Sequence, residues 1–201
     1  MLDFTLEDQL SEKGYKYICG VDEAGRGPLC GPVVAAAVIL PRDAEIPGLN
    51  DSKKLTEKKR EALFDVICEK AIAYSIAYGT VELINQTNIL EATMAAMNQA
   101  VNSLPTPADH ALIDGNISRG FSIPTTTVIH GDAISPSIAA ASILAKVTRD
   151  RLCIELDAEY PMYGIAKHKG YGTKEHMEAL RKYGPAPIHR TKFIRFLNED
   201  K

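Results

Sequence analysis

The stretch that decides the fold is residues 17–40, which read YICGVDEAGRGPLCGPVVAAAVIL. A short apolar run rich in β-prone residues ends at two adjacent carboxylates, Asp22 and Glu23. A glycine-rich turn follows, and a second apolar run then extends from Val33 to Leu40. This order predicts two strands joined by a tight turn, with the acidic pair at the end of the first strand.

Adjacent acids at the end of a buried strand need a compensating partner. Their charges repel each other unless a cation, a shared proton or a hydrogen-bond network lies between them. Hard divalent cations such as Mg²⁺ prefer oxygen ligands of this kind. The plain alternative for an Asp-Glu pair alone is a solvated turn, because most acidic side chains are exposed.

The turn after the acids, Gly25-Arg26-Gly27-Pro28, does not match known nucleotide-binding loops. A P-loop needs Lys followed by Ser or Thr, and no such pair follows Gly31. The dinucleotide-binding pattern fails because its sixth position is Cys30. Glycine nevertheless permits a close approach between the backbone and another molecule. The turn is therefore expected to present backbone amides and Arg26 to a sugar-phosphate chain.

Two later strands are predicted to end on acids in the same way. Residues 110–113 form a short apolar run that delivers Asp114, and residues 125–129 precede His130-Gly131-Asp132. Ligands of open α/β sheets gather at the carboxyl ends of strands, so we expect these acids to converge. Four carboxylates are able to hold two divalent metals for in-line cleavage of a phosphodiester. The four candidates are Asp22, Glu23, Asp114 and Asp132.

No second catalytic pattern is found. The histidines at positions 110, 130, 168, 176 and 189 are scattered and form neither an HExxH motif nor a zinc-ligand spacing. His130 is expected to be structural although it precedes Asp132. The four cysteines form no CxxC pair, so we expect buried thiols in a reducing compartment.

The sequence pattern of the first half of the chain predicts an antiparallel meander of three strands and one helix. Residues 1–16 are expected to be a lead-in, either extended or a short helix, without an assigned function. Thr56 is a fitting N-cap for a helix that runs to about Lys70. Residues 72–78 alternate large and small side chains, as a strand does.

The second half predicts long helices and a basic C-terminal part. Residues 81–104 carry an apolar stripe at helical spacing, and Ser135-Pro136 is a suitable start for the longest helix. We take residues 17–160 as the core and residues 161–201 as a basic helical part of the same domain. A chain of 201 residues is long enough for one well-packed domain.

The charge distribution indicates a polyanionic partner more clearly than the net charge of -3 does. Residues 167–195 hold eight lysines and arginines against two glutamates. A basic region opposite an acidic centre suits a metal-dependent nuclease, and the plain alternative is a solvated helical face. Tyr171 beside Lys169 suits a stacked sugar or base next to a phosphate; otherwise the ring covers a hydrophobic patch.

The sequence also restricts the cellular setting. The longest apolar run, Val33 to Leu40, is too short to cross a bilayer, and the first residues lack an apolar signal core. We therefore expect a cytoplasmic protein with no membrane partner. We also expect a monomer.

Taken together, these motifs resemble the type 2 ribonuclease H family. The matching segments are DEAGRGP at 22–28, DSKKL at 51–55, LIDG at 112–115, GD at 131–132, SILAKVTRD at 142–150 and HKGY at 168–171. The resemblance implies an α/β RNase H-like fold, with a mixed five-stranded sheet flanked by helices and a small helical C-terminal part. It also implies an endonuclease that cleaves the RNA strand of RNA–DNA hybrids. Cleavage 5′ to single ribonucleotides in duplex DNA is implied too, with 3′-hydroxyl and 5′-phosphate products and a role in ribonucleotide removal.

The resemblance assigns roles to individual residues. The four acids match the family's metal ligands, so Mg²⁺ or Mn²⁺ is the expected cofactor, with two ions during catalysis. Gly25-Arg26-Gly27 matches the loop that senses the ribose 2′-hydroxyl, and Tyr171 matches the tyrosine that stacks on the deoxyribose at the RNA–DNA junction. Lys53 belongs to a motif that lines the substrate side and is our candidate phosphate contact. The chain shows no clear sliding-clamp-binding motif.

Three further residues are candidate substrate contacts. Lys169 precedes Tyr171 in the basic C-terminal part, and Asn88 and Thr93 lie in the helical region after residue 81. All three carry hydrogen-bonding side chains that could reach a nucleic acid.

Two other functions compete with a nuclease. A catalytically silent binder of hybrid duplexes would be weakened by four acids near the phosphates. A metal-dependent hydrolase of small phosphates would not need a wide basic surface or Tyr171. We therefore favour the nuclease.

Overall fold

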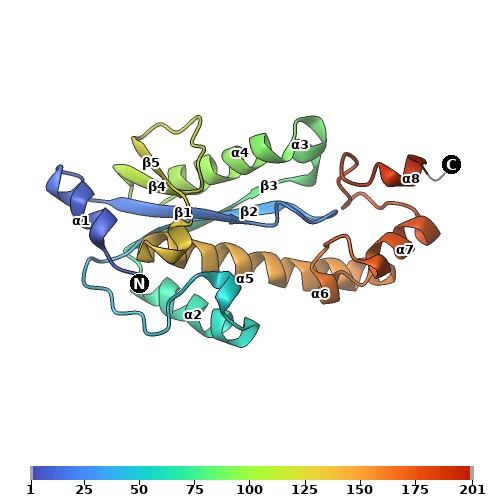
Figure 1. The fold of residues 1–201 in the computed structure, drawn as a ribbon, viewed down its shortest axis with the longest axis horizontal. Coiled ribbons are helices and arrows are strands. Elements are labelled where there is room, and N and C mark those ends of the chain that lie inside the picture. Colours follow the sequence, from blue (N-terminus) through green and yellow to red (C-terminus); the bar gives the residue numbers. More distant parts are fainter. Residues whose placement is uncertain (1, 200–201) are drawn as a thin grey trace.

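A mixed sheet of five strands forms the centre of the computed structural model, which describes residues 2–199. The strand order is β3-β2-β1-β4-β5 (Figure 1). The strands are β1 (Ile18–Ala24), β2 (Val33–Ile39), β3 (Ala73–Gly79), β4 (His110–Asp114) and β5 (Thr125–Val128). The first three pair antiparallel, whereas β4 runs parallel to β1 and β5 parallel to β4. The predicted meander and mixed five-stranded sheet are therefore confirmed.

Most of the predicted helices are present with their predicted caps. The α-helices are α1 (Thr5–Glu12), α2 (Glu57–Lys70), α3 (Val81–Gln86), α4 (Ile89–Asn102), α5 (Pro136–Glu159), α6 (Ile165–His168), α7 (Lys174–Tyr183) and α8 (Phe196–Glu199). Short 3₁₀ turns are η1 (Ser52–Lys54), η2 (Gly131–Ala133) and η3 (Pro161–Tyr163). The Thr56 and Ser135 side chains accept hydrogen bonds from the first turns of α2 and α5, as N-caps do.

The expectation of one continuous helix over residues 81–104 is wrong. The backbone leaves helical geometry at Thr87, and Asn88 begins a new helix by accepting a hydrogen bond from the amide of Glu91. An apolar stripe continues through a break of this kind, so periodicity alone does not reveal it.

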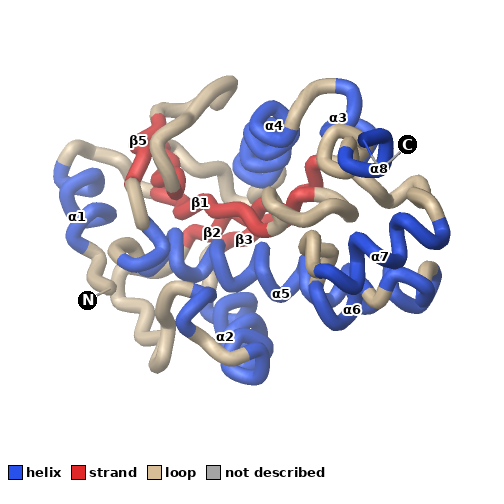
Figure 2. Tube along the Cα trace, turned by 45° about the vertical axis from the view of Figure 1, so that its right-hand side comes forward, coloured by secondary structure: helices blue, strands red, loops and turns tan. Residues whose placement is uncertain are grey.

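Helices cover both faces of the sheet. In Figure 2, α4 lies on one side of the strands and α5, with α2 beyond it, on the other. Alternate residues of β2 divide between two cores: Ala35 and Ala37 pack in the cluster with α4, and Ala36 and Val38 in the cluster with α5 and α2. Burial on both faces explains why β2 is a continuous apolar run.

The start of α5 lies directly on β1. A Cβ atom placed on Gly20 would come within 2.1 Å of the backbone carbon of Ser137, so only glycine allows this contact. Gly20 lies two residues before Asp22, and side chains two apart on a strand share a face. This packing therefore fixes the first turns of α5 beside the acidic end of β1.

The lead-in is a helix that caps α5 from outside. Glu7 of α1 is buried, and its Oε1 accepts hydrogen bonds from the Ser135 hydroxyl at 2.6 Å and the Ser137 amide at 3.3 Å. A carboxylate at a helix N-terminus is stabilised by the free amides and the helix dipole. Residues 2–16 thus pack against the core through α1.

The C-terminal part packs on the far end of α5, at the right of Figure 1. Its apolar core joins Cys30 and Cys153 to Tyr163, Ile165, Leu180 and Ile194. Backbone hydrogen bonds also link residues 29–31 to this part: Leu29 donates to Gly170, and Gly31 donates to Ile188. Among the described residues, no helix is both long and apolar enough to cross a membrane.

Candidate active site

A cleft of about 230 Å³ opens at the carboxyl end of β1, beside the middle of α5. Its lining includes the acidic pair, the glycine turn, the loop before α2 and one face of α5. The lining residues are Asp22, Glu23, Ala24, Gly25, Arg26, Gly27, Ser52, Lys53, Asp114, Ser142, Lys146, Arg149 and Tyr171.

Strand register brings the acids to one end of the sheet. Because Val21 of β1 lies opposite Ile113 of the parallel strand β4, Asp22 and Asp114 are at matching positions on neighbouring strands. The Asp114 Oδ1 accepts a 2.7 Å hydrogen bond from the amide of Gly131. This bond holds the 3₁₀ turn that carries the buried Asp132.

The carboxylates are held in an environment that disfavours their charge. Burial raises the pKa of Asp22 well above its usual value, and repulsion from Glu23 and Asp114 adds to this shift. Burial also raises the pKa of Glu23, although Arg26, 3.2 Å from its Oε1, acts in the opposite direction. The Asp114 pKa is raised by burial and then by Asp132. The site therefore carries more negative charge than its own residues stabilise.

The donor set fits hard divalent cations. Carboxylate oxygens are the ligands that Mg²⁺ and Mn²⁺ favour. Besides Arg26 beside Glu23, Lys53 is a cation of the chain in contact with these acids, with its Nζ 3.2 Å from Asp132 Oδ2. Among the described residues, no three of the acids have oxygens all within 4.8 Å of one another.

The glycine turn is shaped by two close contacts. Gly25 has φ +95°, and a Cβ there would lie 1.9 Å from Nε of Arg149. A Cβ on Gly27 would meet Cε1 of Tyr171 at 3.3 Å. The Tyr171 ring therefore lies against the turn, and its side chain remains about half exposed toward the cleft.

The loop that carries Lys53 is fixed to α5 and α2. The hydroxyls of Ser52 and Ser142 lie 2.7 Å apart in the buried interior. Asp51 accepts a hydrogen bond from the Lys53 amide, and Arg60 donates to the carbonyls of Ser52 and Leu55. Lys53 consequently extends from a firmly held turn into the cleft.

Residues 19–196 match the family model described as Ribonuclease HII. The chain belongs to the ribonuclease HII family. It is therefore a ribonuclease H, a metal-dependent endonuclease, and its family is consistent with cleavage of RNA strands in RNA–DNA hybrids.

Individual relatives agree with this assignment. The ribonuclease HII of Acetivibrio thermocellus is 57% identical over 189 residues, which cover 94% of this chain and 74% of that protein. The crystal structure of ribonuclease H2 from Pyrococcus horikoshii OT3 superposes with a TM-score of 0.74 at 27% identity, covering 92% of this chain and 98% of that one. A crystal structure of Bst-RNase HIII in complex with Mn²⁺ shares the fold, with a TM-score of 0.65 at 19% identity, and covers 90% of this chain and 64% of that one.

Three of the expected substrate contacts lie outside the cleft of this ribonuclease H. The Asn88 side chain caps α4, and the buried Thr93 donates its hydroxyl to the carbonyl of Ile89. The Lys169 ammonium is directed toward Glu57, at 3.8 Å. Asn88 and Thr93 thus stabilise α4, and Lys169 takes part in an ion pair.

The basic C-terminal part is less uniform than its sequence suggests. Lys167 pairs with Glu175 at 2.7 Å, Lys174 lies 3.8 Å from Glu178, and Arg190 is fully buried. Part of the positive charge is therefore neutralised or withdrawn from the surface.

One face of α5 contributes site residues that the sequence analysis did not assign. Ser142, Lys146 and Arg149 all line the cleft. Their spacing of four and three residues places them on one helical face, which is the signal that could have identified them. Ser142 also hydrogen-bonds Asp22 and so lowers the pKa of that acid against the larger effect of burial.

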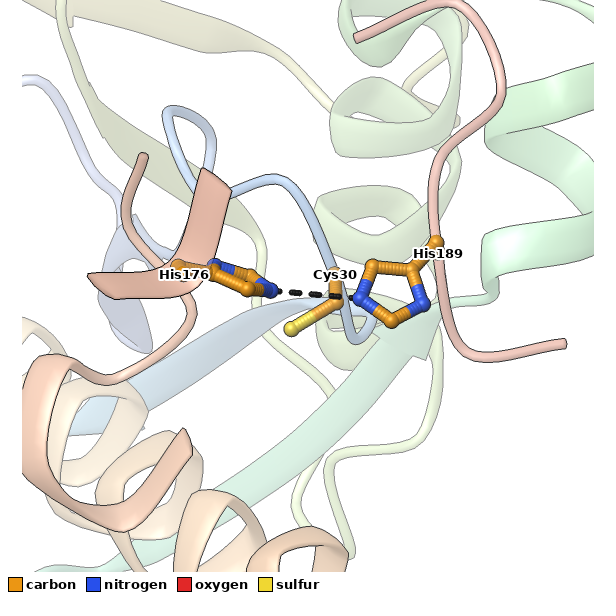
Figure 3. Close-up of side chains that lie close together, drawn as sticks. All are labelled: Cys30, His176 and His189. Atoms are coloured by element: carbon orange, nitrogen blue, oxygen red, sulfur yellow. Dashed lines mark hydrogen bonds between the residues drawn. The ribbon is translucent and has the colours of Figure 1, made fainter. Parts of the chain in front are cut away.

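Two of the five histidines, His176 and His189, lie together in space, contrary to the sequence-based expectation that all five are scattered. Figure 3 shows His176 and His189 beside Cys30, all three buried. Their ligand atoms lie within 4.8 Å of one another, the one such His/Cys/Asp/Glu group within residues 2–199. Two histidines 13 positions apart have no recognisable ligand spacing, so folding alone brings them together.

Hydrogen bonds account for every ring nitrogen of that pair. His176 Nδ1 lies 3.0 Å from the Tyr171 carbonyl and must carry the proton, so its Nε2 accepts from His189 Nε2 at 3.2 Å. His189 Nδ1 then accepts from the Ala186 amide at 3.0 Å. The pair therefore forms a neutral relay that holds the segment carrying Tyr171.

Proposed function

We propose that this ribonuclease H hydrolyses the phosphodiester on the 5′ side of single ribonucleotides embedded in duplex DNA, and also the RNA strand of hybrids. The products would carry 3′-hydroxyl and 5′-phosphate ends, and the cellular role would be ribonucleotide removal from DNA. The observation that carries the proposal is the contact between Tyr171 and the Gly25–Gly27 turn in the cleft that Asp22, Glu23 and Asp114 line.

That contact suits a substrate with RNA on one side and DNA on the other. The 2′-hydroxyl is the group that distinguishes a ribonucleotide, and it can both donate and accept a hydrogen bond. The glycine turn can approach a ribose closely because it has no side chains at two of its positions. Tyr171 offers a half-exposed ring on which the next sugar, a deoxyribose without the hydroxyl, can stack.

The chain's own residues define the steps of the reaction. Asp22, Glu23, Asp114 and Asp132 would hold two Mg²⁺ or Mn²⁺ ions, which activate water and stabilise the leaving oxygen. Ser142 orients Asp22 through a hydrogen bond, and Gly131 orients Asp114. Lys53 would leave Asp132 when the site is loaded and contact a substrate phosphate. We further propose that the enzyme acts as a monomer in the cytoplasm.

The test is cleavage of a DNA duplex that contains one ribonucleotide, with Mg²⁺, with Mn²⁺ and with chelator. An all-DNA duplex and the Asp22→Asn variant serve as controls. Metal-dependent cutting on the 5′ side of the ribonucleotide, lost in the variant, is expected. Cutting of long hybrids alone would contradict the roles of the turn and Tyr171. Tight binding without cutting would indicate a silent binder.

A further inference from the structure

Arg190 is a fully buried cation whose hydrogen-bond acceptors are all backbone carbonyls, and its guanidinium also lies 5.3 Å from the ring centroid of Phe193. Its side chain donates to Gly25 at 2.7 Å, Arg26 at 2.9 Å, Pro28 at 2.8 Å and Gly31 at 2.9 Å. Among the described residues it forms no ion pair with an acid. Burying a guanidinium without a carboxylate is costly unless its hydrogen bonds are satisfied, so this arrangement calls for a reason.

The hydrogen bonds of Arg190 organise the polarity of the glycine turn. The carbonyls of Gly25, Arg26 and Pro28 accept from the guanidinium, and the Leu29 amide donates to the Gly170 carbonyl. The amides of residues 25–27 have no such partner within residues 2–199. The carbonyl groups of the turn are thus occupied by hydrogen bonds, whereas its amide groups remain available. Free amides are what a backbone needs to bind a sugar hydroxyl or a phosphate.

The same region joins the turn to the Tyr171 segment. Arg149 donates to the carbonyls of Lys169 and Cys30, and the amide of Arg190 donates to Leu29. His189, next to Arg190, pairs with Cys30 in a β-bridge and continues through His176 to the Tyr171 carbonyl, as Figure 3 shows in part. The two elements that would contact the ribose and the deoxyribose are therefore held by one set of bonds.

We propose that Arg190 is a positioning residue for ribonucleotide recognition: from behind the Gly25–Pro28 turn, it fixes the free amides against Tyr171 without touching the substrate. This inference rests on the proposed function of the turn. Because Arg190 acts through carbonyls at 25, 26, 28 and 31, the number and directions of its donors matter and its charge alone does not.

The direct test is Arg190→Lys, which keeps the charge but replaces a planar fork by a single donor group. We expect kcat on the single-ribonucleotide duplex to fall at least ~10-fold, with KM within about threefold, because phosphate contacts elsewhere remain. Mn²⁺ binding, measured by calorimetry, is expected to match the wild type, since Arg190 contacts none of the acids. Arg42→Lys is the matched control, because Arg42 also donates to a carbonyl, that of Glu7, away from the cleft.

Limited trypsin digestion measures how firmly the turn is held, independently of catalysis. The Arg26 side chain is exposed, so its bond to Gly27 becomes cleavable once the turn loosens. We expect faster cutting there in Arg190→Lys and unchanged cutting in Arg42→Lys. A kcat equal to that of the wild type, or an unchanged rate of cutting at Arg26, would overturn the inference. Wild-type protein that fails to cut the ribonucleotide duplex would overturn the proposed function instead.

Should Arg190→Lys fail to fold, the wild-type protein provides the test by NMR of labelled arginines. The Nε–H of Arg190 is bonded to Gly31, so its signal is expected to resist solvent exchange, unlike that of the exposed Arg26. With Ca²⁺ as a non-catalytic ion, a ribonucleotide-containing duplex is expected to shift the Arg190 signal more than an all-DNA duplex does. Equal shifts with both duplexes would refute the positioning role.

Discussion

The ring of Tyr171 lies so close to Gly27 that a methyl group on that glycine would meet ring carbon Cε1 at 3.3 Å. A stacking ring and a backbone without side chains thus form neighbouring walls of one cleft. Tyr171→Ala should therefore lower cleavage at a 5′-RNA–DNA-3′ junction by ~10-fold or more, the scale of one lost base–aromatic stacking contact. Tyr171→Phe, which keeps the ring, should retain most of the rate.

The control for Tyr171→Ala is Tyr183→Ala, because Tyr183 is similarly exposed on α7 and does not line the cleft. Steady-state cleavage of junction and uniform-hybrid substrates provides the measurement. An unchanged junction preference in Tyr171→Ala would remove its assigned role.

Gly25 and Gly48 allow backbone strain to be separated from crowding. Both have positive φ, +95° and +84°, but a Cβ on Gly48 meets nothing within 4 Å whereas one on Gly25 meets Arg149 at 1.9 Å. Gly48→Ala should cost about 1 kcal/mol of unfolding free energy, the usual strain of a left-handed residue. Gly25→Ala should cost clearly more and abolish cleavage. Urea unfolding of both variants decides this, and equal losses would show that Arg149 yields without cost.

Neutralising one buried acid should stabilise the metal-free protein while it stops turnover. In Asp22→Asn, the amide removes a charge that burial and two neighbouring acids disfavour, so unfolding free energy in chelator should rise by about 1 kcal/mol or more. Turnover with Mg²⁺ should fall by at least ~100-fold because a metal ligand is lost. Asp114→Asn should behave alike, and exposed Asp43→Asn should change neither quantity. A variant that keeps the wild-type rate would not belong to the metal site.

Lys53 should weaken metal binding and strengthen substrate binding. Its ammonium, 3.2 Å from Asp132, competes with a divalent ion for the same carboxylate. Lys53→Met should therefore tighten Mn²⁺ binding in calorimetry, and it should raise KM for the duplex because a phosphate contact is lost. Lys54→Met is the matched control, since Lys54 pairs only loosely with Asp51 at 3.9 Å. Weaker Mn²⁺ binding in Lys53→Met would mean that the lysine supports the ion.

The His176–His189 relay should make the fold sensitive to mild acid. Burial lowers the pKa of His189 from 6.5 to about 4, so the unfolded chain binds a proton between these pH values and the folded chain does not. The stability due to neutral His189 is therefore complete above pH 6.5 and is lost as the pH falls toward 4. At pH 5 the loss should be about 2 kcal/mol.

Urea unfolding at pH 7.5 and pH 5 measures this loss, and His189→Asn serves as the reference. The buried carboxyls, whose pKa values are raised, act with the opposite sign in both proteins, and their contribution cancels in the comparison. An identical pH dependence in wild type and variant would contradict the neutral relay.

Sequence patterns predict the strand ends and the helix caps of this molecule, because neighbouring residues in the chain determine both. Asp22 and Asp114 each end an apolar run, so the sequence places them at strand ends, and parallel pairing then makes them neighbours. Thr56 and Ser135 are recognisable as caps because a cap bonds amides within its own turn. The sheet and the acidic centre follow from such signals.

The roles of Arg190 and Lys169 depend on contacts with residues far away in the sequence, so sequence patterns do not predict them. Arg190 looks like Lys192 and Arg195 in a basic run, and only the carbonyls 159 to 165 residues earlier make it a buried structural cation. Lys169 has a side chain that suits a phosphate contact, yet its ammonium faces Glu57 on α2. Distant partners of this kind leave no local periodicity or cap to detect.

The separation between the turn at residues 25–28 and Arg190 also bears on how the enzyme is made. The five strands and all four acids precede residue 190 by more than 50 residues, so they leave the ribosome well before it does. A nascent chain can therefore assemble the metal-binding end of the sheet while the turn next to it still lacks its support. Selectivity for RNA would be acquired later than the acidic centre, when the segment around Arg190 leaves the exit tunnel and docks behind the turn.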